Sequence, residues 1–147
     1  MSPDARLQGR YAGSVSRLVA WLIDLAVSSI SLSALIVASV VVFDVINGDR
    51  VQLRTPPALG VTATTAWLAL YLFVSWAVPG RTPGQALLGL HVIRSDGEDL
   101  SWPRAAIRVV TFPLSFVLGI GLLGIVLGRR HRAFHDVCAD SVVIFDW

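Results

Sequence analysis

The sequence predicts an all-α membrane protein with two transmembrane helices, a third hydrophobic segment, a small cytoplasmic β-hairpin and a C-terminal strand. Hydrophobic residues make up 54% of the 147 residues and charged residues only 15%, whereas soluble domains carry about a quarter charged residues. Three stretches contain no charged side chain, residues 25–43, 55–80 and 109–128. Each is long enough to cross a hydrocarbon core of roughly 30 Å.

The composition also excludes several classes of protein. Intrinsic disorder needs low hydrophobicity and high charge, and the single cysteine, Cys138, excludes a disulfide framework and a thiolate metal cluster. The net charge is +2, and the arginines flank apolar segments instead of forming a basic face, so we expect no nucleic-acid partner. No hydrolase elbow, phosphate-binding loop or dinucleotide fingerprint occurs, and we expect neither enzymatic activity nor a cofactor.

The first helix is expected over residues 15–43 and the second over residues 58–78. Ser14 or Ser16 can cap the first helix, which we interpret as an uncleaved anchor because Arg17 and Asp24 interrupt the smooth apolar core of a signal peptide. Helix-breaking residues at 47–49 and 56–57 separate the two helices, and a Pro-Gly pair at 79–80 ends the second.

A cytoplasmic hairpin region is expected over residues 81–102. Thr82 offers an N-cap with proline at the first helical position, which predicts a short helix before a strand at 90–94. Asp96-Gly97 is a strong turn dipeptide, and the return strand begins near Leu100. A second β-branched run, residues 141–145, is predicted to pair with the first strand because an isolated hairpin is only marginally stable.

The distribution of arginine predicts the topology. Arginines concentrate in the N-terminal flank, the 81–108 region and the tail, so the positive-inside rule places all three in the cytoplasm. Two crossings satisfy that arrangement, and the third segment, within residues 103–139, is then a re-entrant or broken helix pair. Its arms would cover residues 103–118 and 121–139, with glycines at 119, 121 and 124 at the bend. The alternative is one straight span with the tail outside.

Three blocks of sequence together resemble the RDD family of small bacterial membrane proteins. The blocks are residues 16–24, residues 80–92 with the sequence GRTPGQALLGLHV, and residues 129–136 followed by 139–143. By this resemblance Arg17, Asp24 and Asp136 are the arginine and two aspartates that name the family. His135 replaces the usual glycine before the second aspartate. The resemblance implies a membrane domain at 15–145 that ends in the strand 141–145 and has a multi-pass location in the bacterial inner membrane. The arginine distribution makes residues 1–14 a cytoplasmic tail.

Four charged residues form the candidate site, either as an ion-binding or as a structural charge cluster: Arg17, Asp24, Arg108 and Asp136. Arg17 and Asp24 share a helix face about 10.5 Å apart, so a bridging group such as Arg108, Asp136 or water is expected between them. Asp24 would bind a proton or cation, dock the first helix against the 104–139 pair, or lie at headgroup level. An intramembrane carboxylate must in each case be paired, protonated or hydrated.

The basic run near the C-terminus suggests further contacts. Arg129, Arg130 and Arg132 are candidates for contact with lipid headgroups, and anionic lipid is a candidate partner. His131 and His135 have the four-residue spacing of zinc-binding helices, but no third ligand is clearly placed, so we expect no metal site.

Two functions follow, and the resemblance implies membrane transport for some family members. We expect an accessory or oligomer-forming subunit of a larger membrane assembly, with the bilayer and either copies of itself or other membrane proteins as partners. Small residues at 34, 38 and 39, or the glycines at 119–124, would form the docking faces. The alternative is a proton- or cation-coupled transporter that works as a homo-oligomer, with Asp24 as the ion-binding carboxylate.

Overall fold

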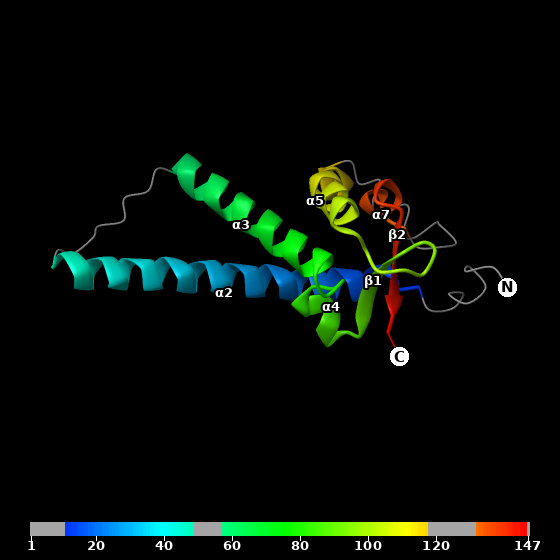
Figure 1. The fold of residues 1–147 in the computed structure, drawn as a ribbon, viewed down its shortest axis with the longest axis horizontal. Coiled ribbons are helices and arrows are strands. Elements are labelled where there is room, and N and C mark those ends of the chain that lie inside the picture. The colour runs from blue at the N-terminus through cyan, green and yellow to red at the C-terminus, as the bar shows by residue number, and fades with distance from the viewer. Residues whose placement is uncertain (1–10, 49–56, 118–131, 147) are drawn as a thin grey trace.

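The computed structural model describes residues 11–48, 57–117 and 132–146. In chain order its elements are α2 (Ser14–Asn47), α3 (Pro57–Ala77), α4 (Pro83–Leu87), β1 (Leu90–Arg94), α5 (Trp102–Val117), α7 (Phe134–Cys138) and β2 (Ser141–Phe145). Figure 1 shows that all of these elements except the far ends of α2 and α3 gather at one end of the molecule.

Helix α2 is longer than the sequence predicts. Its 34 residues correspond to about 50 Å at a rise of ~1.5 Å per residue, well beyond a hydrocarbon core of roughly 30 Å. The helix ends at Gly48, which adopts a left-handed backbone (φ 70°) and donates its N–H to the Asp44 carbonyl. The extra length lets the first turns of α2 join the compact end of the fold while the rest of the helix extends away from it (Figure 1).

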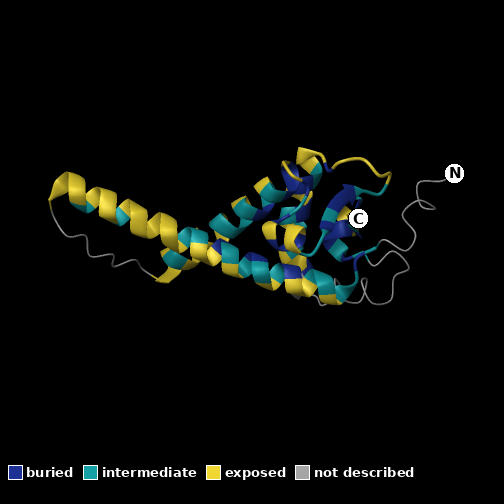
Figure 2. Cartoon of the chain, turned by 90° about the horizontal axis from the view of Figure 1, so that it is seen from below, coloured by how far each residue is buried: buried dark blue, intermediate teal, exposed yellow. Residues whose placement is uncertain are grey.

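Helices α2 and α3 are long and apolar enough to cross a membrane. Only 6% of the most apolar stretch of each is buried inside the protein, whereas a core helix of a soluble protein would be mostly buried. The helices are joined near their middles, where the Trp67 indole donates to the Ser28 carbonyl and the Ser31 hydroxyl, both at 3.2 Å. They then diverge toward the C-terminal end of α2, which Figure 2 shows as almost entirely exposed.

The predicted pairing of the two strands is confirmed, and the predicted hairpin is only partly formed. Strands β1 and β2 are antiparallel, with Leu90 opposite Phe145 and Arg94 opposite Ser141. The return after the Asp96-Gly97 turn is reduced to one isolated bridge, between Ile93 and Asp99. Ile93 pairs with Asp99 of the return and also with Val142 of β2, so the return and β2 lie along opposite edges of β1.

Helix α4 begins as the sequence predicts. The Thr82 hydroxyl accepts the Gln85 N–H at 3.2 Å, and the Gln85 side-chain oxygen accepts the Thr82 N–H at 2.9 Å. This reciprocal pair is a capping box, and Pro83 follows at the first helical position. The capping box fixes the turn that carries Gly84 against α2.

The third hydrophobic segment is described only at its two ends. Helix α5 covers most of the predicted first arm, and residues 118–131 lie outside the described part of the chain, so the choice between crossing and re-entry lies there too. The expected single helix over 121–139 is broken, because Ala133 has an extended backbone (ψ 167°) and α7 begins only after it. The Asp136 carboxylate accepts the Ala133 N–H at 2.9 Å, which satisfies the backbone at this break.

Candidate functional site

Three of the four predicted charged residues meet in the compact end of the fold. Arg17 on α2 and Arg108 on α5 both approach the carboxylate of Asp136 on α7. Arg17 Nη1 donates to Asp136 Oδ2, and Arg108 Nη1 lies 2.8 Å from Asp136 Oδ1. The Asp136 side chain is completely buried and that of Arg108 is 2% exposed. We refer to Arg17, Arg108 and Asp136 as the ion cluster, which ties together three segments distant in sequence.

The contacts around the ion cluster are uneven. Arg108 Nη1, which carries two N–H bonds, donates to the Ser141 hydroxyl at 2.7 Å and also lies 2.8 Å from Asp136 Oδ1. Asp136 Oδ1 has no well-aligned hydrogen bond, whereas Oδ2 accepts from both Arg17 and the Ala133 backbone. Two cations against one anion leave the cluster with an excess positive charge.

Burial and charge together set the protonation states of the cluster. Burial alone raises the pKa of Asp136, but the positive charges of Arg108 and Arg17 outweigh it and hold that pKa well below its ordinary range. Burial lowers the pKa of Arg108 to about 10, against the attraction of Asp136, and the guanidinium stays protonated at neutral pH. Burial lowers the pKa of His135 to about 4, so its imidazole is neutral.

Asp24 does not join the ion cluster. Its Oδ1 accepts the Tyr71 hydroxyl at 2.8 Å and the Gly84 N–H at 2.8 Å, and its Oδ2 accepts the Thr82 hydroxyl at 2.5 Å. Within the described ranges no arginine contacts this carboxylate. The expected bridge between Asp24 and Arg17 is therefore replaced by three neutral donors, two of which, Thr82 and Gly84, come from the α4 turn.

The approach of α4 to α2 depends on Gly84. A Cβ at this position would lie 2.2 Å from the Ala20 carbonyl oxygen and 2.9 Å from the Asp24 carboxylate. Backbone cannot give way by that amount, and only glycine allows the contact. Sequence reasoning missed the residues that bind Asp24, because the pattern around Thr82 indicates only a helix cap. A short Thr-Pro-Gly turn with free N–H groups, set against an unpaired buried carboxylate, was the available signal.

Only one residue of the histidine pair, His135, lies in the described part of the chain. His131 lies outside it, and no group of three or more potential ligands occurs within it. His135 is buried, with its Nδ1 2.8 Å from the Ser115 hydroxyl and its Nε2 3.4 Å from Asp136 Oδ1. The neutral imidazole forms no ion pair, and its hydrogen bond with Ser115 therefore sets its orientation beside the ion cluster.

A second group of charges surrounds Asp140 at the surface. Arg104 and Arg132 contact its carboxylate at 3.0 and 3.1 Å, and Ser95 donates to it at 2.6 Å. The hydrogen bond from Ser95, with the contacts from the two arginines, outweighs the opposing effect of burial and lowers the pKa of Asp140 to about 2. Arg132 also donates to the Ser141 carbonyl at 3.0 Å, so this predicted headgroup ligand is directed into the protein. Arg129 and Arg130 lie outside the described residues.

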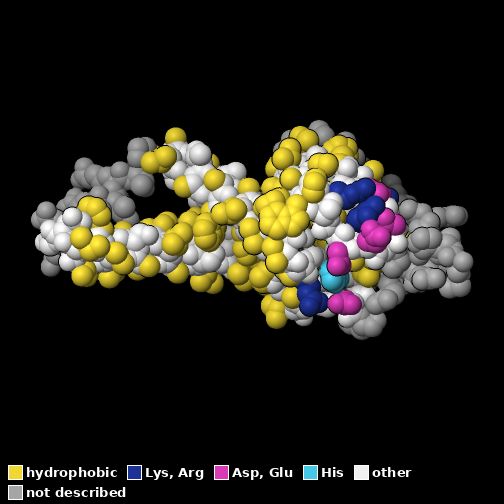
Figure 3. Space-filling view, viewed as in Figure 1, with side chains coloured by type: hydrophobic (Ala, Val, Ile, Leu, Met, Phe, Trp, Pro, Cys, Tyr) yellow, Lys and Arg dark blue, Asp and Glu magenta, His cyan; other side chains and the backbone are white. Residues whose placement is uncertain are grey.

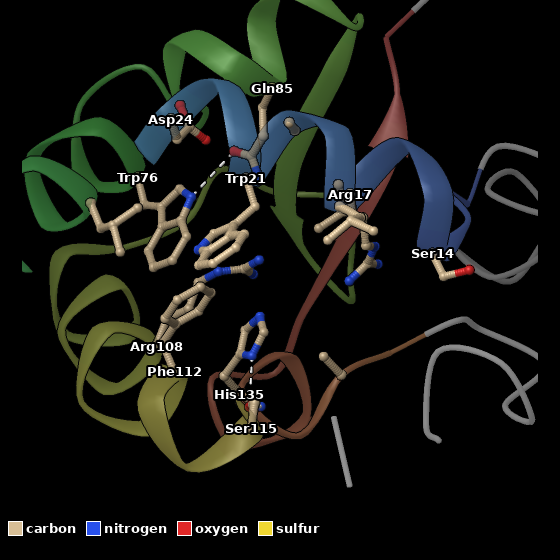
Figure 4. Close-up of a pocket in the computed structure, with 15 residues that line it drawn as sticks. Ser14, Arg17, Trp21, Asp24, Trp76, Gln85, Arg108, Phe112, Ser115 and His135 are labelled. Carbon is tan, nitrogen blue, oxygen red and sulfur yellow. Dashed lines mark hydrogen bonds between the residues drawn. The ribbon is translucent and has the colours of Figure 1, made fainter. Parts of the chain in front are cut away.

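A cavity of about 220 Å³ opens beside the ion cluster. Figure 4 shows the side chains of Arg17, Arg108 and His135 pointing into one space beneath Trp21. The lining residues are Ser14, Arg17, Leu18, Ala20, Trp21, Asp24, Leu72, Trp76, Gln85, Arg108, Phe112, Ser115, Ala133, His135 and Val143. The Trp76 indole donates to Gln85 at 3.2 Å, and the Arg108 guanidinium lies 4.6 Å from the centre of the Trp76 ring. Sequence reasoning could not predict this cavity, because its wall is assembled from five helices and strand β2.

Comparison with known proteins gives one match. The sequence model of the RDD family matches residues 11–140. No curated protein and no solved structure matches the chain. The match covers α2 through α7, and so includes the ion cluster and the partners of Asp24.

Proposed function

The chain belongs to the RDD family of small membrane proteins, and from that premise we propose that it is an oligomer-forming or accessory subunit of a larger membrane assembly. In this role α2 and α3 span the bilayer, and the compact end of the fold holds the two helices in a fixed position relative to each other. We extend the proposal to a non-catalytic role, with the N-terminus, the 81–102 region and the tail on the cytoplasmic side of the bacterial inner membrane.

The observation that carries the proposal is one unpartnered face of α2. A shallow groove runs along it, lined at four-residue intervals by Ser29, Ile30, Ser33, Ala34, Val37, Ala38, Val41 and Val42. Small residues at this spacing let the backbone of a neighbouring helix approach closely, which is how helices associate in lipid. Helix α3 diverges from this part of α2 (Figure 1), and Ile30, Val37, Val41 and Val42 stay exposed, so no described element fills the groove.

The groove differs from the docking face expected from sequence in one position. Ala34 and Ala38 are four residues apart and line the groove together, but Ser39 does not line it. At ~3.6 residues per turn, Ser39 is rotated about 140° from Ala34, and it therefore lies on another side of the helix. The Ser39 hydroxyl is hydrogen-bonded to the Leu35 carbonyl at 2.8 Å instead.

The oligomeric state in mild detergent or nanodiscs tests the proposal. We expect a particle of more than one chain, or one with a stoichiometric partner, by native mass measurement. Ala38→Leu fills the groove and should shift the particle toward the single chain. The matched control is Ser39→Leu, which adds similar bulk to the same turn outside the groove and should leave the particle unchanged. A single-chain wild type with no partner, or equal effects of the two variants, contradicts the proposal.

The hydrogen bonds of Asp24 support a structural role, in which it docks α2 against its neighbouring elements, over a role in transport. A carboxylate buried in a spanning helix is a functional candidate by default, and the transport alternative assigns it ion binding. Here both oxygens already accept hydrogen bonds from Thr82, Gly84 and Tyr71, which joins α2 to α4 and α3. Asp24→Asn separates the two roles. Docking predicts weaker assembly with no ion flux in wild-type vesicles, whereas flux in the wild type that this variant abolishes favours transport.

A further inference from the structure

Two arginines that line the cavity each carry a donor nitrogen that has no acceptor among the described residues. These nitrogens are Arg17 Nη2 and Arg108 Nε, and both are buried. The Arg108 side chain is 2% exposed and that of Arg17 is 11% exposed. A buried donor on a charged group is costly when it stays unpaired, so these two groups call for an acceptor that enters from the cavity.

The charge balance specifies the sign of that acceptor. The two guanidinium groups share one carboxylate, and Asp136 is not among the residues that line the cavity. Among residues 11–48, 57–117 and 132–146, no carboxylate pairs with the arginines from the cavity side. Asp24 lines the cavity too, but its oxygens are turned toward Tyr71, Thr82 and Gly84, beside α4. The neutral His135 adds no charge of its own.

The other side chains of the cavity wall are mostly apolar, which indicates that the ligand also carries an apolar part. Trp21, Leu72, Trp76 and Phe112 surround the arginines, and Figure 4 shows the aromatic rings stacked around the Arg108 guanidinium. Leu18 lines the cavity and is 51% exposed, so the cavity reaches the outer surface of α2. In Figure 3 hydrophobic side chains cover the two long helices on the visible face, and the charged side chains there gather at the compact end. A volume of about 220 Å³ holds a headgroup and the start of a chain.

The geometry points to a binding site for an anionic headgroup, a carboxylate or a phosphate, attached to an apolar chain. The headgroup oxygens accept from Arg17 Nη2 and Arg108 Nε, and the chain leaves past Leu18 to the apolar surface of α2. One negative charge neutralises the excess charge of the ion cluster. A free fatty acid and an acidic phospholipid of the bilayer share this chemistry.

Bromine quenching of tryptophan fluorescence tests the site in the full chain. In a neutral detergent at alkaline pH, 9,10-dibromostearate should quench Trp21 and Trp76 saturably. Its methyl ester has the same chain without the charge, and should bind at least about tenfold more weakly because it forms no charged hydrogen bond. Equal quenching by the acid and the ester, or no saturable quenching by the acid or by a brominated acidic phospholipid, overturns the inference. This comparison requires no variant.

A conservative substitution then assigns the headgroup contact. Arg17→Lys keeps a charge for Asp136 but removes the second nitrogen, and it should weaken binding about tenfold or more. The matched control is Arg104→Lys, which changes an arginine that contacts Asp140 outside the cavity and should leave binding unchanged. Equal affinities of the two variants overturn the assignment. The groove variant Ala38→Leu should retain binding, so the failure of the subunit proposal is distinguishable from the failure of this one.

Nanodiscs distinguish the two sources of the headgroup. Brominated phosphatidylglycerol, as a minority lipid in phosphatidylcholine, should quench more than brominated phosphatidylcholine at the same fraction if the bilayer supplies the anion. Equal quenching by the two lipids, together with tight binding of dibromostearate over its ester, identifies a free fatty acid as the ligand. Either result supports an anionic headgroup site, whereas the absence of any preference for an anion in both experiments refutes it.

Discussion

Substitution of Asp136 by asparagine should destabilise the protein more than any other single change of charge that we consider. The side chain is completely buried, and it is the carboxylate between Arg17 and Arg108, which are 11% and 2% exposed. Asparagine keeps the shape and still accepts the Ala133 N–H, but it leaves two buried cations without an anion. Breaking a buried ion pair in this way costs about 3–5 kcal/mol of unfolding free energy.

Denaturant titration in mild detergent measures the free energy of unfolding of the Asp136→Asn variant. The control is Asp140→Asn, which removes an equal charge that also faces two arginines. The Asp140 side chain is 49% exposed, so this change should cost less than about 1 kcal/mol. Equal losses in the two variants would refute the reasoning, because they would mean that burial does not amplify the interaction.

The pH dependence gives a second check on the same carboxylate. The pKa of Asp136 is lower in the folded protein than in the unfolded chain, so its contribution is complete above an unfolded value of about 4. It is lost as the pH falls from there toward the folded pKa. Asp136→Asn should therefore flatten the acid limb of the stability curve, and an unchanged acid limb would count against the ion cluster.

The remaining predictions concern a close contact, a buried imidazole and the topology. Gly84→Ala should destabilise the fold by about 2 kcal/mol or more through overpacking against the α2 backbone, whereas Gly60→Ala, with open space around its Cβ, should be neutral or stabilising in denaturant titration. The pKa of His135 is lowered to about 4, so stability should fall by roughly 3 kcal/mol as the pH drops from about 6.5 to 4. His135→Gln should remove that slope, and His91→Gln should retain it. Cys138 is exposed, and with a cytoplasmic tail an impermeant maleimide should label it only after intact cells are permeabilised; labelling before permeabilisation would place the tail outside.

Local features of the chain were predictable because they depend on neighbours in sequence. Runs of apolar residues without charge locate α2 and α3, and the Thr82 capping box locates α4. The pairing of β1 with β2 also followed from sequence, because two short β-branched strands need each other. The break before α7 did not follow, since the Asp136 hydrogen bond to Ala133 replaces the helical one there.

The candidate site was likewise predictable from the sequence only in part. The need of buried charges for partners predicted one cluster of Arg17, Asp24, Arg108 and Asp136, and the structure brings together all of these except Asp24. The same principle predicted an arginine beside Asp24, and there the structure supplied neutral donors instead. A carboxylate is satisfied by any well-placed N–H or O–H, and residue type alone does not tell which donor reaches it.

By itself, the sequence determined that this protein has two membrane-length helices, that β1 pairs with the C-terminal strand β2, and that it carries fewer charged residues than a water-facing surface needs. Those properties come from composition and periodicity, which act over a few turns of chain. Only the tertiary structure decided that α4 covers Asp24, that the arginines turn toward a common cavity, and that one face of α2 lacks a partner. These depend on distances between segments far apart in the chain, where one glycine without a Cβ decides how closely two backbones can meet.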